Sequence, residues 1–432
     1  MWKFIKMLIA GIAVSFYFFP FEFTFLPGVN TKMAMAAVGL ILFVLDYVRK
    51  YNGRAVMNKE FLSIFSLAII FSLLVLCSVI LNNSSDYSYA TYFVSMSVWV
   101  AGAYFVIKVI KLIHKEISVR LLCNYLIAVC VGQCIIALCI DNIPEFKDWI
   151  NRYILGFDFV DLEKLNRLHR LYGIGAALDV AGTRFAAVLI MIAFLTKTYE
   201  ADLSFSHMFM YLCSFVFIAI VGDMLARTTV LGVIIALLYW IIPNGRSQKG
   251  TRALLYMFLI ICITLPYIVY LYNTNESFYN DIRFAFEGFF SLVEKGKWEV
   301  GSNDILVSMI VFPDEIKTWI IGDGYFVNPG SIDAYYVGEQ YAGYYKGTDI
   351  GYLRFIFYCG LIGLTAFILF FLKVAKCCAN RLKQYSLLFY ILLFLNFVIW
   401  FKVSTDIFVV FALFLVLGTD DDLRSKQTVL DL

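Results

Sequence analysis

A group of basic side chains in the middle of the chain has the residue types that bind phosphate. Arg167, His169 and Arg170 lie close together, and Arg184 follows in the next apolar stretch. A guanidinium group can hold a phosphate through two parallel hydrogen bonds. The pattern therefore predicts a site for a phosphate-bearing ligand. The same arginines could instead reach lipid head groups or pair with nearby carboxylates.

Asp223 and Arg227 form a second candidate, between two closely spaced apolar stretches. If both belong to one helix, their spacing allows an intrahelical ion pair. Alternatively, Asp223 orients Arg227 toward a substrate. We favour the second interpretation, because a charge at the end of a membrane-spanning stretch usually has a function.

Carboxylates and tyrosines make up the remaining candidates. Tyr325 follows Gly322-Asp-Gly324, and Asp349 and Tyr352 lie at the start of a later apolar stretch. A carboxylate there could accept a proton from a sugar hydroxyl as a general base, or it could cap a helix. Tyr325 and Tyr352 could contact a sugar, although tyrosines also form the aromatic belt of membrane proteins.

The elements that must position these residues are membrane helices. Of the 432 residues, 62% are hydrophobic and 16% are charged, and the mean hydropathy is +0.81. Soluble proteins carry about 25% charged residues, so this composition excludes a soluble globule, a disordered chain and a collagen-like repeat. The net charge of +3 gives no reason to expect a nucleic-acid partner. The three scattered histidines and the cysteines in apolar runs give no reason to expect a metal site.

An all-α, polytopic integral membrane protein is therefore expected. A helix needs about 20 apolar residues to cross a bilayer. The first qualifying stretch follows Lys3 and Lys6 and is expected to be a retained span. About twelve stretches qualify on this criterion: 4–26, 33–48, 61–81, 90–110, 121–140, 176–196, 207–225, 228–242, 253–271, 350–372, 385–401 and 406–418.

The basic residues predict an orientation for these spans. With the N-terminus inside, most lysines and arginines fall in the cytoplasmic connections, so both termini are expected in the cytoplasm. The chain then divides into spans (1–140), an amphipathic outer segment (141–175), further spans (176–271), a large outer loop (272–348) and the last spans with a tail (349–432). The candidate residues all fall on the outer side.

The order of these features resembles the O-antigen polymerase and ligase superfamily. The resemblance rests on Arg170-Leu-Tyr-Gly173, Ala226-Arg-Thr-Thr-Val-Leu-Gly232, Gly322-Asp-Gly324, and Asp349-Ile-Gly-Tyr-Leu with Gly360-Leu-Ile-Gly363. Each motif is short, and their order and common membrane side carry the resemblance. The N-terminal third and the last two spans agree only in being hydrophobic.

The resemblance implies a GT-C-like, metal-independent glycosyltransferase of the bacterial inner membrane. Members of the superfamily use an undecaprenyl-diphosphate-linked oligosaccharide as donor on the periplasmic side and need no cofactor. Arg170 and Arg227 would bind the donor diphosphate and stabilise the leaving group, with Arg184 as an accessory contact. Asp349 would be the general base, with His169 as the alternative.

One departure from the superfamily favours a particular activity. Ligases typically carry a histidine near the outer end of the span that follows the large loop, where this chain has Thr348 and Asp349. The expected function is therefore that of a Wzy-type polymerase, which extends a lipid-linked repeat unit at its non-reducing end, beside a flippase and a chain-length regulator. Two alternatives stay open: an O-antigen ligase that transfers glycan to a lipid A core, and a lipid-linked oligosaccharide flippase or transporter.

Overall fold

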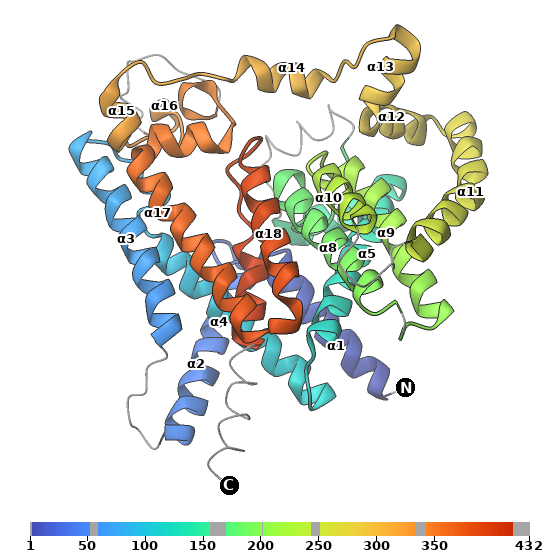
Figure 1. Cartoon of the computed structure of the whole chain (residues 1–432), viewed down its shortest axis with the longest axis horizontal. Helices are drawn as coiled ribbons and strands as arrows, with labels where there is room; N and C mark the ends of the chain where they lie inside the picture. The colour runs from blue at the N-terminus through green and yellow to red at the C-terminus, as the bar shows by residue number, and fades with distance from the viewer. Residues whose placement is uncertain are drawn as a thin grey trace. The chain divides into compact units, whose positions relative to one another are not determined.

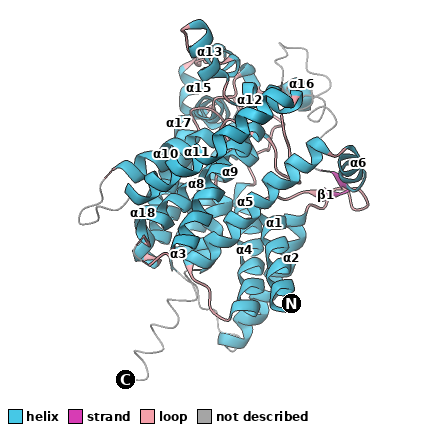
Figure 2. Ribbon diagram, turned by 90° about the vertical axis from the view of Figure 1, so that its right-hand side faces the viewer, coloured by secondary structure: helices cyan, strands magenta, loops and turns pink. Residues whose placement is uncertain are grey.

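The computed structural model describes residues 2–51, 59–155, 170–200, 202–242, 251–332 and 343–417, which are mostly helical (Figures 1 and 2). The helices form two compact units. The first comprises residues 1–38 and 102–298, and the second comprises residues 39–101 and 299–432.

In the described part of the chain, seven helices are long and apolar enough to cross a membrane, so this is an all-α, multi-pass membrane protein. They are α2 (Thr31–Tyr51), α3 (Lys59–Leu81), α4 (Tyr92–His114), α5 (Val119–Asn142), α8 (Leu178–Thr198), α9 (Phe205–Leu225) and α17 (Gly351–Arg381). An eighth span exists only if α11 (Thr251–Thr274) is joined to α12 (Glu276–Ala285), from which it is bent by 118°. Shorter apolar helices are α10 (Thr229–Ile241), α18 (Ser386–Ile399) and Phe408–Leu417.

Each predicted span overlaps one of these helices or the first helix, α1 (Trp2–Phe18). The predicted bounds of the first span, 4–26, were wrong. α1 ends at Phe18 because Pro20 disfavours a helical conformation in the residue before it. The chain then forms β1 (Glu22–Phe23), which pairs antiparallel with β2 (Ile154–Leu155).

The predicted amphipathic segment contains one described helix, α6 (Pro144–Tyr153). Figure 2 shows α6 close to β1. Trp149 and Tyr153 of α6 are exposed. The opposite face packs into a buried apolar cluster of Ile140, Ile150, Tyr172 and Ala177. This cluster joins α6 to the segment that precedes α8.

α8 is the most deeply buried helix of the first unit. Every residue from Ala181 to Lys197 is buried, and the helix packs against α5, α9 and α10. The approach of α10 is especially close, because a Cβ added to Gly232 would overlap the backbone of Ala186. Small residues on both helices permit this spacing, as is common between membrane helices.

Gly232→Ala is expected to lower the stability of the protein by about 1–3 kcal/mol, because the added methyl group must displace backbone atoms of α8. Thermal unfolding of the purified protein in detergent measures the effect. Gly132→Ala in α5 is the matched control, since an added Cβ there meets nothing within 4 Å. Equal melting temperatures for the two variants would contradict the described packing of α8 and α10.

In the second unit, α3 and α17 lie side by side (Figure 1). α17 is broken at Gly360, whose φ of 64° lies in the left-handed region that favours glycine. The helix α15 (Ile316–Ile321) packs against this break, where a Cβ on Gly360 would overlap the carbonyl group of Ile320. The break therefore lets Gly322-Asp-Gly324, which follows α15, lie against α17.

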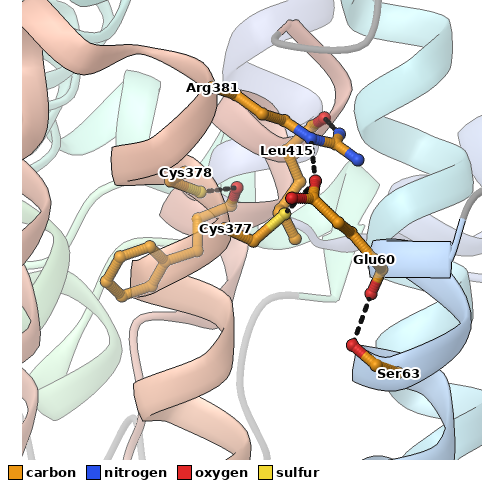
Figure 3. Close-up of polar contacts among 7 residues, drawn as sticks. Glu60, Ser63, Cys377, Cys378, Arg381 and Leu415 are labelled. Atoms are coloured by element: carbon orange, nitrogen blue, oxygen red, sulfur yellow. Dashed lines mark hydrogen bonds and ion pairs between the residues drawn. The ribbon is translucent and has the colours of Figure 1, made fainter.

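An ion pair joins α3 to the C-terminal end of α17 (Figure 3). Arg381 donates from Nε to Glu60 Oε2 at 2.8 Å and from Nη1 to the carbonyl oxygen of Leu415 at 3.2 Å. Glu60, in the first turn of α3, also accepts a hydrogen bond from Cys377 Sγ at 3.4 Å. These contacts join the ends of α3, α17 and the helix Phe408–Leu417. Arg381 therefore has a structural role in addition to being one of the basic residues that predict the orientation.

The predicted large loop, 272–348, contains several short helices. α12 and α13 (Glu287–Lys295) belong to the first unit. The rest of the loop belongs to the second unit and contains α14 (Gly301–Ser308), α15, α16 (Pro329–Ile332) and the 3₁₀ helix η1 (Tyr345–Gly347). A second 3₁₀ helix, η2 (Lys383–Tyr385), follows α17.

Candidate functional site

Two of the predicted arginines meet around one phenylalanine in the first unit. Arg170 lies in the segment before α8, and Arg227 lies in the turn between α9 and α10. Their guanidinium carbons are 5.2 Å and 4.1 Å from the centre of the Phe284 ring in α12. Nη2 of Arg227 also donates to the backbone carbonyl of Phe284 at 2.8 Å. The structure thus brings together the two arginines that the sequence assigned to a phosphate.

The two arginines place like charges beside each other, and the carboxylates of Asp179, Asp223 and Glu287 lie near them. The pKa of Arg170 is lowered because burial disfavours the charged form and because Arg227 repels it, while Asp179 and Asp223 act in the opposite direction. Arg170 nevertheless keeps its positive charge, since a guanidinium group is not deprotonated in proteins. The Nε of Arg170 is buried and has no hydrogen-bond partner among the described residues. An anion bound here would reduce the repulsion and accept that hydrogen bond.

The turn that carries Arg227 is held against the start of α8. Thr228 Oγ1 donates to Asp179 Oδ1 at 3.2 Å, and Thr229 Oγ1 donates to the carbonyl of Gly222 at 3.0 Å. Gly182 permits the close approach, because a Cβ there would lie 2.9 Å from the side chains of Ala226 and Thr228. The two threonines and the nearby glycines therefore fix the turn.

Asp223 and Arg227 do not share a helix. α9 ends at Leu225, so Asp223 lies inside the helix and Arg227 beyond its end. The sequence allowed an intrahelical i, i+4 ion pair between these two residues. The structure does not have this geometry, because the helix ends between them. Asp223 is 2% exposed, and its carboxylate acts electrostatically on Arg170.

Glu287 completes the surroundings of Arg227, and sequence reasoning missed it. Its Oε2 accepts a hydrogen bond from Arg227 Nη2 at 2.7 Å. Phe284 and Glu287 both come from the α12–α13 segment, far from Arg227 along the chain. The predicted large loop had an excess of acidic residues, but nothing in the sequence showed which carboxylate would reach an arginine.

Arg184 has different contacts from Arg170 and Arg227. Its guanidinium group donates to the carbonyl of Phe18 and lies 5.7 Å and 5.5 Å from the ring centres of Phe18 and Phe19. A cation at the C-terminal end of α1 is favoured by the helix dipole. These contacts hold α8 against α1, and they give the accessory phosphate contact predicted for Arg184 no support.

The segment around Arg170 depends on a close backbone approach. Gly173 donates its N–H to the carbonyl of Ala176 at 2.7 Å, and a Cβ on Gly173 would clash with Oε1 of Gln133. The same Oε1 accepts a hydrogen bond from the N–H of Ile174 at 3.0 Å. Arg167 and His169 lie outside the described residues, so their predicted roles stay predictions.

Asp281 is a buried carboxylate in α12, one turn before Phe284. It is 5% exposed, and burial together with the nearby Asp141 raises its pKa to about 7. A raised pKa means that the folded protein binds this proton more tightly than the unfolded chain does. The stability contributed by the protonated form is therefore present below about pH 4 and is lost as the pH rises toward about 7.

Asp281→Asn is expected to increase stability above pH 7, by about 1 kcal/mol or more, because the amide imitates the protonated carboxyl. The gain over the wild type should shrink as the pH falls toward about 4. Melting temperatures measured across this range check the trend, with the exposed Glu276→Gln in the same helix as control. A difference that does not change with pH would contradict the raised pKa.

In the second unit, Asp349 lies immediately before α17. Its side chain is 25% exposed, and its Oδ1 lies 3.7 Å from Nη1 of Arg354. Ile350 is the N-cap of α17, and no side chain caps this helix. The alternative of a helix cap is therefore wrong for Asp349.

Arg354 is a second residue whose role sequence reasoning missed. Its guanidinium carbon lies 3.7 Å and 3.9 Å from the ring centres of Phe326 and Tyr344. Its Nη1 donates to Ser404 Oγ at 2.7 Å, and the side chain is 7% exposed. Held in this way, Arg354 is a fixed positive charge beside Asp349. The sequence did contain a signal for this role, because Arg354 is a basic residue within an apolar stretch.

The two candidate tyrosines have different surroundings. Tyr325 is half-buried, with its ring 5.4 Å from that of Tyr345, whose hydroxyl donates to Asp323 at 3.2 Å. Tyr352 donates its hydroxyl to the carbonyl of Phe397 at 3.0 Å and packs against the end of α18. Tyr325 stays a candidate for a sugar contact, whereas the contacts of Tyr352 are those of helix packing.

Comparisons with protein-family models, with curated proteins and with solved structures find no match to this chain. Among the described residues, no three histidine, cysteine, aspartate or glutamate side chains are grouped so that they could hold a metal ion. The ten cysteines are all free thiols. The arginine pair and the carboxylate before α17 are therefore the candidate functional groups of the described chain.

Proposed function

We propose that the protein is a membrane-embedded glycosyltransferase of the polysaccharide-polymerase type. It would transfer a glycan from an undecaprenyl-diphosphate-linked donor to the non-reducing end of a lipid-linked repeat unit. The observation that carries the proposal is the meeting of Arg170 and Arg227 around Phe284. Two guanidinium groups in a partly buried region suit the diphosphate of a lipid-linked sugar better than they suit a neutral ligand.

The proposed reaction breaks the bond between the anomeric carbon of the donor sugar and the diphosphate oxygen. A hydroxyl of the acceptor sugar forms the new glycosidic bond. Negative charge develops on the departing diphosphate, and Arg170 and Arg227 would stabilise it through preorganised N–H donors. Because both guanidinium groups are already held against Phe284, they would need little reorganisation at the moment of transfer.

The acceptor hydroxyl loses a proton in this reaction, and Asp349 is the proposed base. Its carboxylate is 25% exposed and lies 3.7 Å from the guanidinium group of Arg354, and a carboxylate within reach of an acceptor hydroxyl can take its proton. His169, which lies outside the described residues, is the alternative base.

The number of membrane spans, their orientation and the fold type are part of the same proposal. The twelve spans follow if α1, α10, α11, α18 and the helix Phe408–Leu417 also cross the membrane. The asymmetric distribution of lysine and arginine supports cytoplasmic termini and a periplasmic site in the bacterial inner membrane. A GT-C-like fold, and partners such as a flippase and a chain-length regulator, follow from the resemblance of the motifs.

Arg170→Ala in a producing cell tests this proposal against its nearest alternative. A polymerase variant should lose the ladder of long glycans while a single repeat unit is still attached to the acceptor. Loss of all attached glycan, with accumulation of lipid-linked polymer, would instead indicate a ligase and would refute the polymerase assignment. An unchanged ladder would remove Arg170 from the reaction.

A further inference from the structure

The α12–α13 segment supplies two acceptors to one nitrogen atom of Arg227. Nη2 donates to the carbonyl of Phe284 at 2.8 Å and to the carboxylate of Glu287 at 2.7 Å. The Phe284 contact comes from the backbone and is fixed by the helix. The Glu287 contact comes from a side chain and can be exchanged for another anion without moving the backbone.

Exposure indicates which partner of this ion pair would move. The side chain of Arg227 is 10% exposed, whereas that of Glu287 is 40% exposed. Arg227 is also held by the ring of Phe284 at 4.1 Å. Rotation of Glu287 toward solvent therefore uncovers less buried surface than rotation of Arg227, which would also break the contacts with Phe284.

A carboxylate and a phosphate make the same kind of charge-assisted hydrogen bond to a guanidinium group. We propose that Glu287 occupies the place of a donor phosphate on Arg227 and is displaced when the diphosphate binds. This inference rests on the proposed function, because it assumes that Arg170 and Arg227 receive the donor. Glu287 then acts as an internal competitor that keeps the site closed to weak anions.

Competition between Glu287 and an incoming anion should affect which phosphate ligand binds to Arg227. An incoming anion must replace the contact of Glu287 and must also tolerate the charges of Asp179 and Asp223 near Arg170. A diphosphate has more charge and more acceptor oxygens than a monophosphate, so it can contact both arginines. The site should therefore prefer a lipid diphosphate to the corresponding monophosphate, and Glu287 should increase that preference.

Binding of farnesyl diphosphate and farnesyl monophosphate to the purified full-length protein tests the inference. Glu287→Gln should tighten binding of the diphosphate by about tenfold, the size expected when one charge-assisted hydrogen bond no longer competes. It should tighten binding of the monophosphate by more than tenfold, which narrows the preference for the diphosphate over the monophosphate. Unchanged or weaker diphosphate binding by Glu287→Gln would overturn the inference.

The matched control is Glu294→Gln. Glu294 belongs to the same helix and forms two 2.7 Å hydrogen bonds with Arg283 of α12, so its loss loosens the same segment without touching Arg227. Binding by Glu294→Gln should equal that of the wild type. Equal tightening in both variants would mean that loosening of the segment, and not removal of a competing charge, caused the effect.

Arg170→Ala separates this inference from the function on which it rests. If Arg170→Ala binds the diphosphate as well as the wild type does, the arginine pair is no phosphate site and the proposed function fails. If Arg170→Ala binds weakly while Glu287→Gln does not bind more tightly, only the competitor role fails.

Discussion

Arg227→Ala is expected to reduce elongation of a lipid-linked glycan by about 10²- to 10³-fold, the usual cost of removing a preorganised donor to a developing negative charge. The substitution removes the guanidinium group that lies 4.1 Å from Phe284 and beside Arg170. The rate at saturating donor should fall, because the arginine acts on the leaving group as well as on binding. Initial rates of chain growth measure the effect.

Two further variants test whether the loss of activity in Arg227→Ala is specific to that guanidinium group. Arg283→Ala removes an arginine of α12 that is paired with Glu294 and makes no hydrogen bond to the Arg227 turn, so it should retain most of the activity. Arg227→Lys keeps the charge but loses the fork of donors, so it should recover only part of the rate. A large loss in Arg283→Ala, or none in Arg227→Ala, would contradict the assignment of Arg227 to the leaving group.

Asp349→Asn is expected to reduce elongation by about 10²- to 10⁴-fold, the range for loss of a general base. The amide has nearly the same shape but cannot accept the proton of the acceptor hydroxyl. Binding of the donor diphosphate should be unaffected, since that contact is assigned to Arg170 and Arg227. Elongation rates and diphosphate binding measured on the same preparation check both statements.

The exposed Asp314→Asn, in the predicted large loop before Asp349, is the control and should behave as the wild type. If Asp349→Asn elongates normally, Asp349 is not the base and His169→Ala becomes the next variant to test. If Asp349→Asn loses diphosphate binding as well as activity, Asp349 supports the structure of the protein and its proposed catalytic role fails.

The helices were predictable because their signal is local. An apolar stretch of sufficient length identifies a span without knowledge of its neighbours, and each predicted span overlaps a helix. The predicted start of α17 was correct to within one residue, whereas α1 stopped earlier than expected. The break in α17 at Gly360 depends on α15, and no apolar pattern reveals such a contact.

The candidate site was predictable only in part. Arg170 and Arg227 could be chosen by residue type and position, because a buried or membrane-boundary arginine needs an anion or acceptor. Their shared neighbour Phe284 and the carboxylate of Glu287 come from a segment 57 to 60 residues beyond Arg227. Arg184 fits the same sequence criterion but donates to Phe18, which lies 166 residues away. Long-range packing decided which arginine meets which acceptor.

The central claim is that the arginine pair holds the diphosphate of a lipid-linked donor during glycosyl transfer. The most direct test supplies purified protein in liposomes with lipid-linked repeat units and without an ion gradient, and measures the length of the lipid-linked glycan. Wild-type protein should elongate the repeat units, and Arg170→Ala and Arg227→Ala should elongate them far more slowly. Absence of any elongation by the wild type, with movement of the lipid-linked glycan across the bilayer instead, would contradict the account.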